Sequence, residues 1–288
     1  MRAAFQSPYS VNWGAPINWQ AHLNRGLLSW WMVAPALNGG TTFRDLCKRN
    51  DGTLTSMDPP TDWVYAGRRG GFGCLDFDGS NDYVNLGAAS GLYFLPLVGS
   101  ACTISFWVNV RPSATGHLFS MWDLAGGVNQ KVFIFDLTGQ AVRNYWSTNG
   151  TADGTTITST TNSTNTWRHV CLTYDGTRRL YINGVEEGTA VTASINTSAT
   201  TNRLAMGAVI GRAADTPVGF ANVQLDSFRI YNRVVNPLRL YREEQSFYPT
   251  TLRRWAKRRV FVPAAPVGGA VGIGLTRSLR LERVRLVG

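Results

Sequence analysis

The sequence lacks several features that mark common classes of protein. Its four cysteines, Cys47, Cys74, Cys102 and Cys171, show no CxxC spacing, which argues against zinc and thioredoxin-like redox motifs. Only three histidines occur in 288 residues, and no Ser-His-Asp or Cys-His arrangement can be read from their positions. The N-terminal residues 1–19 contain no apolar stretch of the kind a Sec signal peptide needs, so we expect no such signal.

Long apolar runs are also missing. The closest is residues 260–275, which is shorter than the ~20 residues that a membrane-spanning helix requires and is interrupted by Pro263, Pro266 and several glycines. We therefore expect no membrane span.

Charged side chains are few and unevenly distributed. They make up 16% of the chain, with a net charge of +10. Residues 253–288 carry nine basic and one acidic side chain, a net charge of +8, whereas the other 252 residues carry 19 basic and 17 acidic side chains. The sequence thus predicts a nearly neutral body followed by a basic C-terminal segment.

The most informative stretch covers residues 167–188, WRHVCLTYDGTRRLYINGVEEG. Apolar side chains alternate along two runs, and Asx-Gly pairs at 175–176 and 183–184 interrupt the alternation. Asx-Gly pairs favour tight hairpin loops because both residues tolerate a positive φ. The pattern predicts a three-stranded antiparallel meander, which is typical of all-β domains.

The clearest single strand is expected at residues 102–110, where Cys102, Ile104, Phe106 and Val108 share one face. Cys102 is thus predicted to be a buried free thiol, and the other cysteines are interpreted as reduced, with disulfides left open. Further strands are expected at 27–33, 75–78, 83–86, 117–124, 131–137, 204–212 and 225–231, and a loop at 56–72.

A short helix is expected after the last strand. Asn236 is a suitable N-cap, and Pro237 suits the first helical position. Leu238 and Tyr241 lie one turn apart, so we expect both to pack against the body.

Four stretches together resemble the laminin-G-like, or concanavalin A-like, jelly-roll domains. They are the meander at 167–188, LDFDGSNDYVNLG at 75–87, TISFWVNV at 103–110 and LDSFRIYNRVVNPLRLY at 225–241. The resemblance implies an all-β, two-sheet antiparallel sandwich. It does not imply one function, because this fold carries lectins, adhesion modules, glycosidases and virion proteins.

The expected organisation has three parts. Residues 1–26 form an N-terminal arm, residues 27–247 the jelly-roll sandwich with its short helix, and residues 248–288 a basic C-terminal arm.

The resemblance also implies a candidate calcium site, because many relatives bind calcium near one rim of the sandwich. The matching oxygen-bearing residues are Asp78, Asn81, Asp82 and Asp226. Asp226 shares strand parity with Phe228, so we expect it to point toward the core, where a carboxylate needs a partner or a metal. The alternative is that Asp78 and Asn81 bond to their own turn and Asp226 accepts loop amides.

Glycoside hydrolysis is a second candidate chemistry, and it requires two carboxylates flanking the scissile bond. The closely spaced acids of the glucanase branch have no counterpart here, because Glu186 and Glu187 point to opposite faces of a strand. His169 is interpreted as structural. We therefore expect no enzyme.

Sugar binding is a third candidate. Trp107, Trp122, Tyr145 and Trp146 offer rings on which sugars stack, although core and sheet-face packing explains the same residues.

The basic C-terminal arm is the fourth candidate. We interpret it as a docking arm with three parts. The basic side chains orient the arm on its partner, the apolar segment is buried against the partner, and residues 279–287 add a strand to one of the partner's sheets. Nucleic-acid binding through the same arginines is the weaker reading. The expected docking residues are Arg253, Arg254, Trp255, Lys257, Arg258, Arg259, Arg280, Arg283 and Arg285.

These observations lead to one functional hypothesis and one alternative. A lectin-like domain usually works outside the cell, and a virion protein reaches that place by lysis without a signal peptide. We therefore expect a non-enzymatic structural protein on the exterior of a bacteriophage particle, a capsid decoration or tail-associated protein, with other virion proteins and copies of itself as partners. The alternative is a carbohydrate-binding adhesion module of an exported cellular protein that binds a cell-surface glycan.

Overall fold

The computed structural model describes residues 17–33, 39–68, 72–88, 100–123, 131–151, 154–197, 203–211 and 216–245. These residues form a 3-10 turn, two α-helices and short to medium β-strands. In chain order the elements are η1 (His22–Asn24), β1 (Leu27–Trp31), β2 (Thr42–Phe43), β3 (Gly52–Thr55), α1 (Pro59–Asp62), β4 (Trp63–Arg68), β5 (Phe72–Asp78), β6 (Tyr83–Ala88), β7 (Cys102–Val110), β8 (His117–Met121), β9 (Phe133–Thr138), β10 (Ala141–Trp146), β11 (Ile157–Thr158), β12 (Arg168–Tyr174), β13 (Thr177–Ile182), β14 (Val185–Thr192), β15 (Arg203–Met206), β16 (Asn222–Tyr231) and α2 (Pro237–Gln245).

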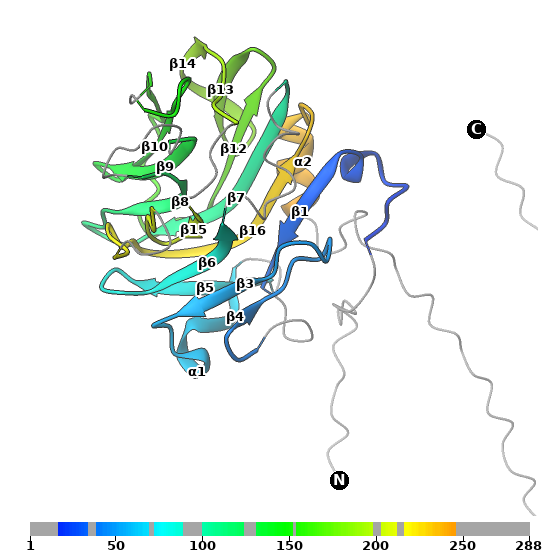
Figure 1. Cartoon of the computed structure of the whole chain (residues 1–288). Helices are drawn as coiled ribbons and strands as arrows, with labels where there is room; N and C mark the ends of the chain where they lie inside the picture. The colour runs from blue at the N-terminus through cyan, green and yellow to red at the C-terminus, as the bar shows by residue number, and fades with distance from the viewer. Residues whose placement is uncertain are drawn as a thin grey trace, which may run out of the picture. The chain divides into compact units, whose positions relative to one another are not determined.

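The strands build two antiparallel sheets that face each other (Figure 1). Sheet 1 has the order β14-β13-β12-β7-β16-β5-β4, and β1 pairs with β16 beside β5. Sheet 2 has the order β11-β10-β9-β8-β15-β6-β3-β2. The expected all-β, two-sheet antiparallel sandwich is therefore confirmed.

The core lies between the sheets. It is formed by the alternate side chains of each strand that point toward the opposite sheet. Phe106 on β7 is fully buried, with ring centroids 5.2 Å from Phe135 of sheet 2 and 5.0 Å from Phe228 of sheet 1. Cys102 lies on the same face and is a buried free thiol, as expected. Burial in this apolar layer raises the pKa of the Cys102 thiol to about 12.

The meander also forms as predicted. Strands β12, β13 and β14 pair antiparallel in sequence order. Asn183 and Gly184 both adopt positive φ values, 53° and 82°, which is the backbone a two-residue hairpin loop requires. The hairpin loop at Asn183 and Gly184 therefore determines which residues of β13 and β14 pair with each other.

Strand β16 is an inner strand of sheet 1 and contains an irregularity that matters for the site. One edge pairs with β7, and the other pairs first with β5 and then with β1. The register with β7 shifts between Asp226 and Arg229, and Ser227 has a φ of 55°. Such a bulge changes the face to which the following side chains point.

The structure differs from the sequence-based prediction at residues 56–72, which were expected to form a loop. Helix α1 and strand β4 lie there, and β4 pairs with β5 as the edge of sheet 1. The two prolines and several glycines of this segment favour a loop. However, Pro59 and Pro60 occupy the first turn of α1, where proline is tolerated, and an edge strand such as β4 tolerates residues with a low strand propensity.

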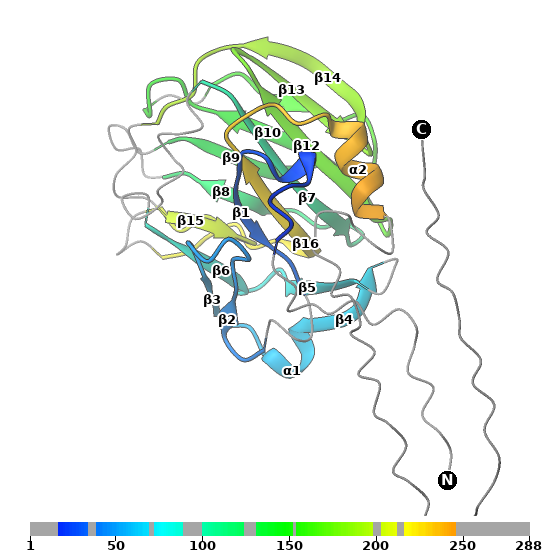
Figure 2. The same ribbon diagram turned by 90° about the vertical axis from the view of Figure 1, so that its right-hand side faces the viewer.

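The outer face of sheet 1 is covered by the η1 turn and α2 (Figure 2). A second apolar cluster lies there and includes Ile17, Leu23, Trp30 and Leu240. Residues 17–26, the described part of the expected N-terminal arm, thus pack against sheet 1, whereas residues 1–16 lie outside the described residues.

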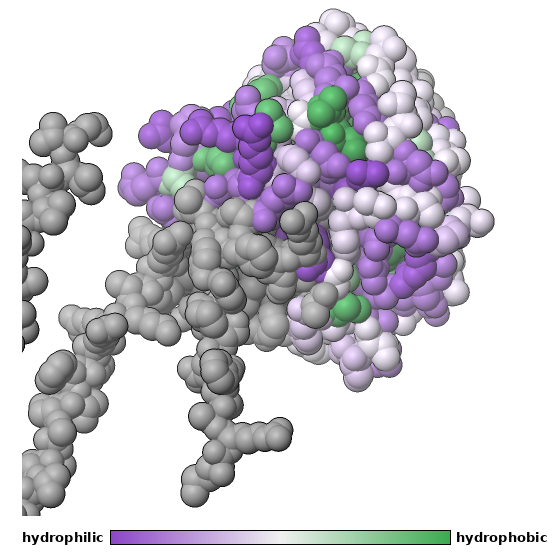
Figure 3. Space-filling model, turned by 180° about the vertical axis from the view of Figure 1, so that it is seen from behind, coloured by the Kyte–Doolittle hydropathy of each residue, from purple (hydrophilic) through white to green (hydrophobic). Residues whose placement is uncertain are grey.

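On one face of the molecule the described surface is mostly hydrophilic or intermediate in hydropathy. Seen from behind, hydrophobic side chains occupy small separate patches among hydrophilic ones (Figure 3). Within the part of the chain that the structure describes, neither α-helix has the length and apolar character needed to cross a bilayer.

Candidate functional site

Helix α2 begins where the sequence predicts. The side-chain Oδ1 of Asn236 accepts a hydrogen bond of 2.9 Å from the backbone N–H of Arg239, which satisfies one of the free amides of the first turn. Leu240 and Glu244, one turn apart, are the buried residues of α2. Leu238 and Tyr241 were expected to pack against the body. Leu238 is 37% exposed but lies against Gly184 in the loop between β13 and β14, and the Tyr241 and Trp107 ring centroids are 5.8 Å apart.

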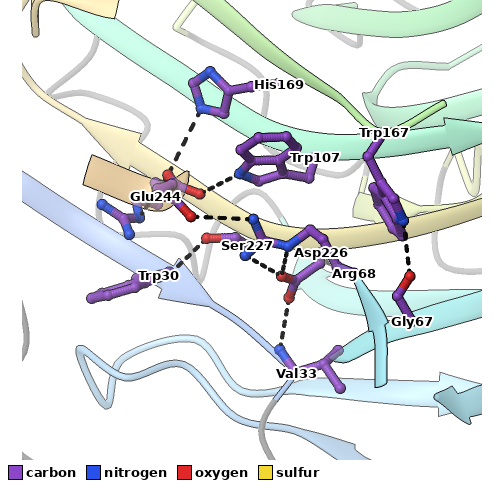
Figure 4. A network of polar contacts seen from close by, with 11 residues as sticks. Trp30, Val33, Gly67, Arg68, Trp107, Trp167, His169, Asp226, Ser227 and Glu244 are labelled. Carbon is purple, nitrogen blue, oxygen red and sulfur yellow. Dashed lines mark hydrogen bonds and ion pairs between the residues drawn. The ribbon is translucent and has the colours of Figure 1, made fainter. Parts of the chain in front are cut away.

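Glu244, in the last turn of α2, carries a carboxylate that is buried against the outer face of sheet 1 (Figure 4). Trp107 Nε1 donates a 2.7 Å hydrogen bond to its Oε2. Arg229 Nε lies 3.2 Å and His169 Nε2 3.8 Å from its Oε1. Glu244 therefore joins α2 to β7 by a hydrogen bond and to β16 by an ion pair, and it lies close to His169 of β12.

A second buried ion pair lies beside the first. Arg68 of β4 places Nη2 2.8 Å and Nε 2.9 Å from Oδ2 of Asp226, while the backbone N–H of Val33 donates to Oδ1 at 2.9 Å. Arg68 Nη1 also donates to the backbone carbonyl of Glu244 at 3.5 Å, and its guanidinium lies 4.6 Å from the centroid of the Trp107 ring. Arg68 thus connects the two pairs.

The position of Asp226 corrects the expectation that it points into the core. It lies opposite Trp107 in the ladder, and Trp107 faces outward because Phe106 and Val108 face the core. The expectation assumed a regular strand, in which Asp226 and Phe228 would point to the same face. The bulge at Ser227 interrupts this alternation, so the two side chains point to opposite faces. Asp226 is therefore buried on the outer face of sheet 1, beneath the elements that cover it, and not in the core between the two sheets.

Burial and pairing set the charges of these carboxylates. Burial alone would raise the pKa of Glu244, but Arg229, with His169 and Arg68, outweighs it and lowers the pKa to about 2. For Asp226 burial dominates over Arg68 and the Val33 amide, and its pKa is raised to about 6. Both side chains are carboxylates at pH 7, and together with Arg68 and Arg229 they form a buried layer with no net charge.

This buried layer is suited to holding α2 in place. Removing one member would leave an unpaired charge away from water, which costs several kcal/mol.

The turn predicted to bind calcium uses its carboxylates internally. Asp78 Oδ1 accepts a 2.7 Å hydrogen bond from the Ser80 amide, and Asp82 Oδ2 accepts one of 3.1 Å from the Asp78 amide. Burial raises the pKa of Asp82 to about 6. Asp226 is not part of this turn, since Asn222 pairs with Asp78 and Asp226 lies four residues, ~13 Å, farther along β16.

Asn81 is an exposed member of the same turn. Among the described residues no group of three or more His, Cys, Asp or Glu side chains is placed to hold a metal. The hydrogen bonds of Asp78 and Asp82 are those of the alternative interpretation, in which the turn is stabilised by its own carboxylates.

Other carboxylates are also occupied by protein donors. Asp136 receives hydrogen bonds of 3.0 and 2.6 Å from the guanidinium of Arg143. Glu187 Oε2 accepts from the backbone amides of Thr160 and Thr161 at 2.8 and 2.9 Å. These two acids serve as structural acceptors.

The four aromatic residues considered for sugar stacking have different environments. Trp107 lies under α2, and Trp146 belongs to the core. Trp122 and Tyr145 meet on the outer face of sheet 2, with ring centroids 6.3 Å apart, but Trp122 is buried. Arg143 covers one face of Tyr145 at 4.4 Å. Only Tyr145 of the four is partly exposed.

The predicted docking residues Arg253, Arg254, Trp255, Lys257, Arg258, Arg259, Arg280, Arg283 and Arg285 lie outside the described residues. The α2 layer, in contrast, was not anticipated. One signal was available, because Leu240 and Glu244 have the i, i+4 spacing of a single helix face, so an inward Leu240 requires an inward Glu244.

Comparisons with known proteins support the fold. A family model described as the concanavalin A-like lectin/glucanases superfamily matches residues 78–239. Trypanosoma rangeli sialidase in complex with sialic acid is similar in structure, with a TM-score of 0.53 and 16% identity over 77% of this chain and 34% of that one. The binding domain of Paraclostridial Mosquitocidal Protein 1 has a TM-score of 0.53 and 17% identity over 76% of this chain and 52% of that one.

The chain therefore spans about a third of the sialidase and about half of the toxin binding domain. At these identities the likeness shows the fold alone. A comparison with curated proteins found no match.

Proposed function

Because the chain belongs to the concanavalin A-like lectin/glucanases superfamily, we propose that it is a non-enzymatic, lectin-like structural protein of a bacteriophage particle. It serves as a capsid decoration or tail-associated protein on the particle exterior. The sandwich is displayed, and the basic segment 248–288 attaches it to other virion proteins.

The buried layer beneath α2 is the observation that carries this proposal. An attachment segment can hold a displayed domain only if the domain is firmly joined to it. Glu244 lies two residues after Arg242 and nine residues before Arg253, and Arg229, Trp107 and Arg68 hold it on sheet 1. These contacts join α2, the element that precedes the basic segment in the sequence, to strands β4, β7 and β16 of sheet 1.

The occupied carboxylates support the non-enzymatic part of the proposal. A glycosidase needs one carboxylic acid and one carboxylate that are both free to reach substrate. Asp136, Glu187, Asp226 and Glu244 instead contact protein donors.

Co-sedimentation with virus particles from the source of the protein tests the proposal. We expect the full-length chain to pellet with particles and a 1–247 truncation to stay in the supernatant. Circular dichroism of the truncation, which retains α2, controls for folding. The proposal fails if neither protein pellets or if both pellet equally.

A charge variant separates specific docking from general adhesion to nucleic acid. Replacing Arg253, Arg254 and Lys257 by alanine should reduce pelleting with intact, nuclease-treated particles. If the full-length chain instead binds free DNA of any sequence with a steep salt dependence, the basic segment is a phosphate-binding arm and the docking proposal is wrong.

Carbohydrate binding is the second candidate function, favoured by Tyr145 on the outer face of sheet 2. Its ring is partly exposed, and the guanidinium of Arg143 lies 4.4 Å from the ring centroid. A glycan array with the 1–247 truncation tests this function without the basic segment, and replacement of Tyr145 by alanine should abolish any signal that arises at this face.

A further inference from the structure

Arg178 of β13 is a buried arginine whose charge is not balanced by an acid. It lies opposite Tyr174 of β12 in the ladder, and Tyr174 belongs to the core, so Arg178 points between the two sheets, where it is 1% exposed. The buried Arg68 and Arg229 each lie beside a carboxylate. Among the residues that the structure describes, none places a carboxylate within ion-pair distance of Arg178, and burial is the sole influence on its charge.

The contacts that Arg178 makes are with neutral groups on the opposite side of the sandwich. Nη1 donates a 3.1 Å hydrogen bond to Oδ1 of Asn144 on β10, and Nη2 donates to the backbone carbonyl of Thr155. The guanidinium carbon lies 5.2 Å from the centroid of the Trp146 ring. Because β13 and β10 belong to the two facing sheets (Figure 1), Arg178 bridges them. These acceptors orient the guanidinium but do not neutralise it.

Two buried donors at this contact have no acceptor in the described chain. They are Nε of Arg178 and Nε1 of Trp146. Neither nitrogen can accept a hydrogen bond, so the two cannot satisfy each other. A buried donor without an acceptor is costly, and more so when it carries charge. Both donors therefore call for an acceptor that this part of the protein does not provide.

The charge of Arg178 specifies the kind of acceptor. Burial lowers the pKa of Arg178 to about 10, so the side chain is still protonated at pH 7. A water molecule satisfies a donor but leaves the charge uncompensated, and a buried charge needs an opposite one.

Burial also limits the size of the ligand. Because Arg178 and Trp146 are each 1% exposed, a carboxylate side chain of another protein cannot reach them while the sandwich is closed. A chloride ion is small, is negatively charged and accepts hydrogen bonds from any direction.

We propose that a chloride ion binds between the two sheets, held by Nε of Arg178 and Nε1 of Trp146, and supplies the missing counter-charge. The ion joins β13 of sheet 1 to β10 of sheet 2 and stabilises the folded chain. This inference is independent of the proposed function, since it concerns the interior of the sandwich and not its attachment to a particle.

Thermal unfolding of the full-length chain at two chloride concentrations tests the site. The concentrations are 0.1 and 100 mM, and sodium methanesulfonate, whose anion is bulkier, keeps the ionic strength constant. For a Kd on the order of 1 mM, chloride that binds only the folded state should raise the Tm by roughly 5–10 °C. An unchanged Tm overturns the proposal, because the donors are then satisfied by a neutral group such as water.

Arg178→Met separates anion binding from a purely structural role. The variant keeps an unbranched apolar stem and removes the charge, so its Tm should not respond to chloride. In 0.1 mM chloride it should be at least as stable as wild type, and in 100 mM chloride less stable. Arg179→Met is the matched control, since Arg179 lies at the surface beside Asp175 and Glu186, and it should keep the full chloride response. An equal loss of Tm by Arg178→Met at both concentrations, or an undiminished chloride response, contradicts the site.

Trp146→Phe tests the second ligand and does not depend on the folding of Arg178→Met. It keeps an aromatic ring against the guanidinium and removes the Nε1 donor. We expect chloride to bind roughly tenfold more weakly, as for the loss of one hydrogen bond to a charged group, and the Tm response to be smaller accordingly. A response as large as that of wild type would show that Trp146 is not a ligand and that the assignment is wrong.

Discussion

The two faces of sheet 1 bury opposite kinds of chemistry. The inner face packs Phe106 and Phe228 against sheet 2 without charge. The outer face carries Glu244, Arg229 and Asp226 in a layer of ion pairs under α2. The free energy gained by burying apolar side chains does not depend on pH or on their exact orientation, whereas that of an ion pair depends on both. The inner face therefore stabilises the sandwich, and the outer face holds α2 on sheet 1.

The largest expected effect is on the inner face. Phe106→Ala removes a ring that contacts both sheets and leaves a cavity, so we expect a loss of about 3–5 kcal/mol in the free energy of unfolding. Urea denaturation followed by tryptophan fluorescence measures it. Val185→Ala is the control, because Val185 is 63% exposed and should change stability by less than about 0.5 kcal/mol. Equal losses in the two variants would contradict the position of the core.

On the outer face, Glu244→Gln keeps the shape of the side chain but leaves the guanidinium of Arg229 buried without its counter-charge. We expect a loss of about 3 kcal/mol, at the lower end for a broken buried pair because the amide oxygen still accepts from Trp107. Glu186→Gln is the matched control, since Glu186 pairs with Arg179 at the surface, where such pairs contribute about 0–1 kcal/mol. Thermal unfolding of both variants makes the comparison, and a Glu186→Gln loss as large as that of Glu244→Gln would refute the anchoring role.

The outer face should also show a specific pH dependence. The pKa of Glu244 is about 2 when folded and 4.5 when unfolded, so the unfolded state binds more protons between these values. Its stabilisation is full above pH 4.5 and disappears as the pH falls toward 2. Asp226 has the opposite sign, since its folded pKa of about 6 exceeds 3.8 and it favours folding increasingly as the pH falls through that window.

Urea denaturation at several pH values measures this dependence. Wild-type protein should lose about 3 kcal/mol more than Glu244→Gln between pH 4.5 and 2. Parallel curves for the two proteins would mean that the acid sensitivity arises elsewhere.

The smallest expected effect concerns the start of α2. Asn236→Ala removes the side chain that accepts from the Arg239 amide and should cost about 1 kcal/mol. Asn236→Asp retains an acceptor at the N-cap and should remain close to wild type. Thermal unfolding compares them, and an Asp variant as unstable as the Ala variant would show that capping is not the reason for Asn236.

The apolar inner face could be predicted from the sequence because it depends on local alternation. Cys102, Ile104, Phe106 and Val108 occupy every second position of one unbroken strand. The turn at Asn183 and Gly184 was equally local. Strand β10 was not anticipated, although Val142 and Trp146 are buried on its inner face, because Arg143, Asn144 and Tyr145 weaken the apolar signal.

The polar outer face could not be predicted because its partners are distant and its geometry depends on a bulge. Arg68 and Asp226 are separated by 158 residues, and only the pairing of β4, β5 and β16 brings them together. The positive φ of Ser227 moves Asp226 to the face opposite the one that simple alternation gives. Glu244 differs, since its i, i+4 relation to Leu240 was readable once a helix was expected.

Hydrogen exchange of α2 in wild-type and Glu244→Gln full-length protein at pH 7 tests the central claim most directly. If buried charges hold α2 on sheet 1, the amides of residues 240–245 should exchange roughly tenfold or more faster in the variant, while those of β7 change much less. Unchanged protection of α2 would show that Leu240 and its apolar neighbours hold the helix, and that the ion layer does not join the basic segment to the sandwich.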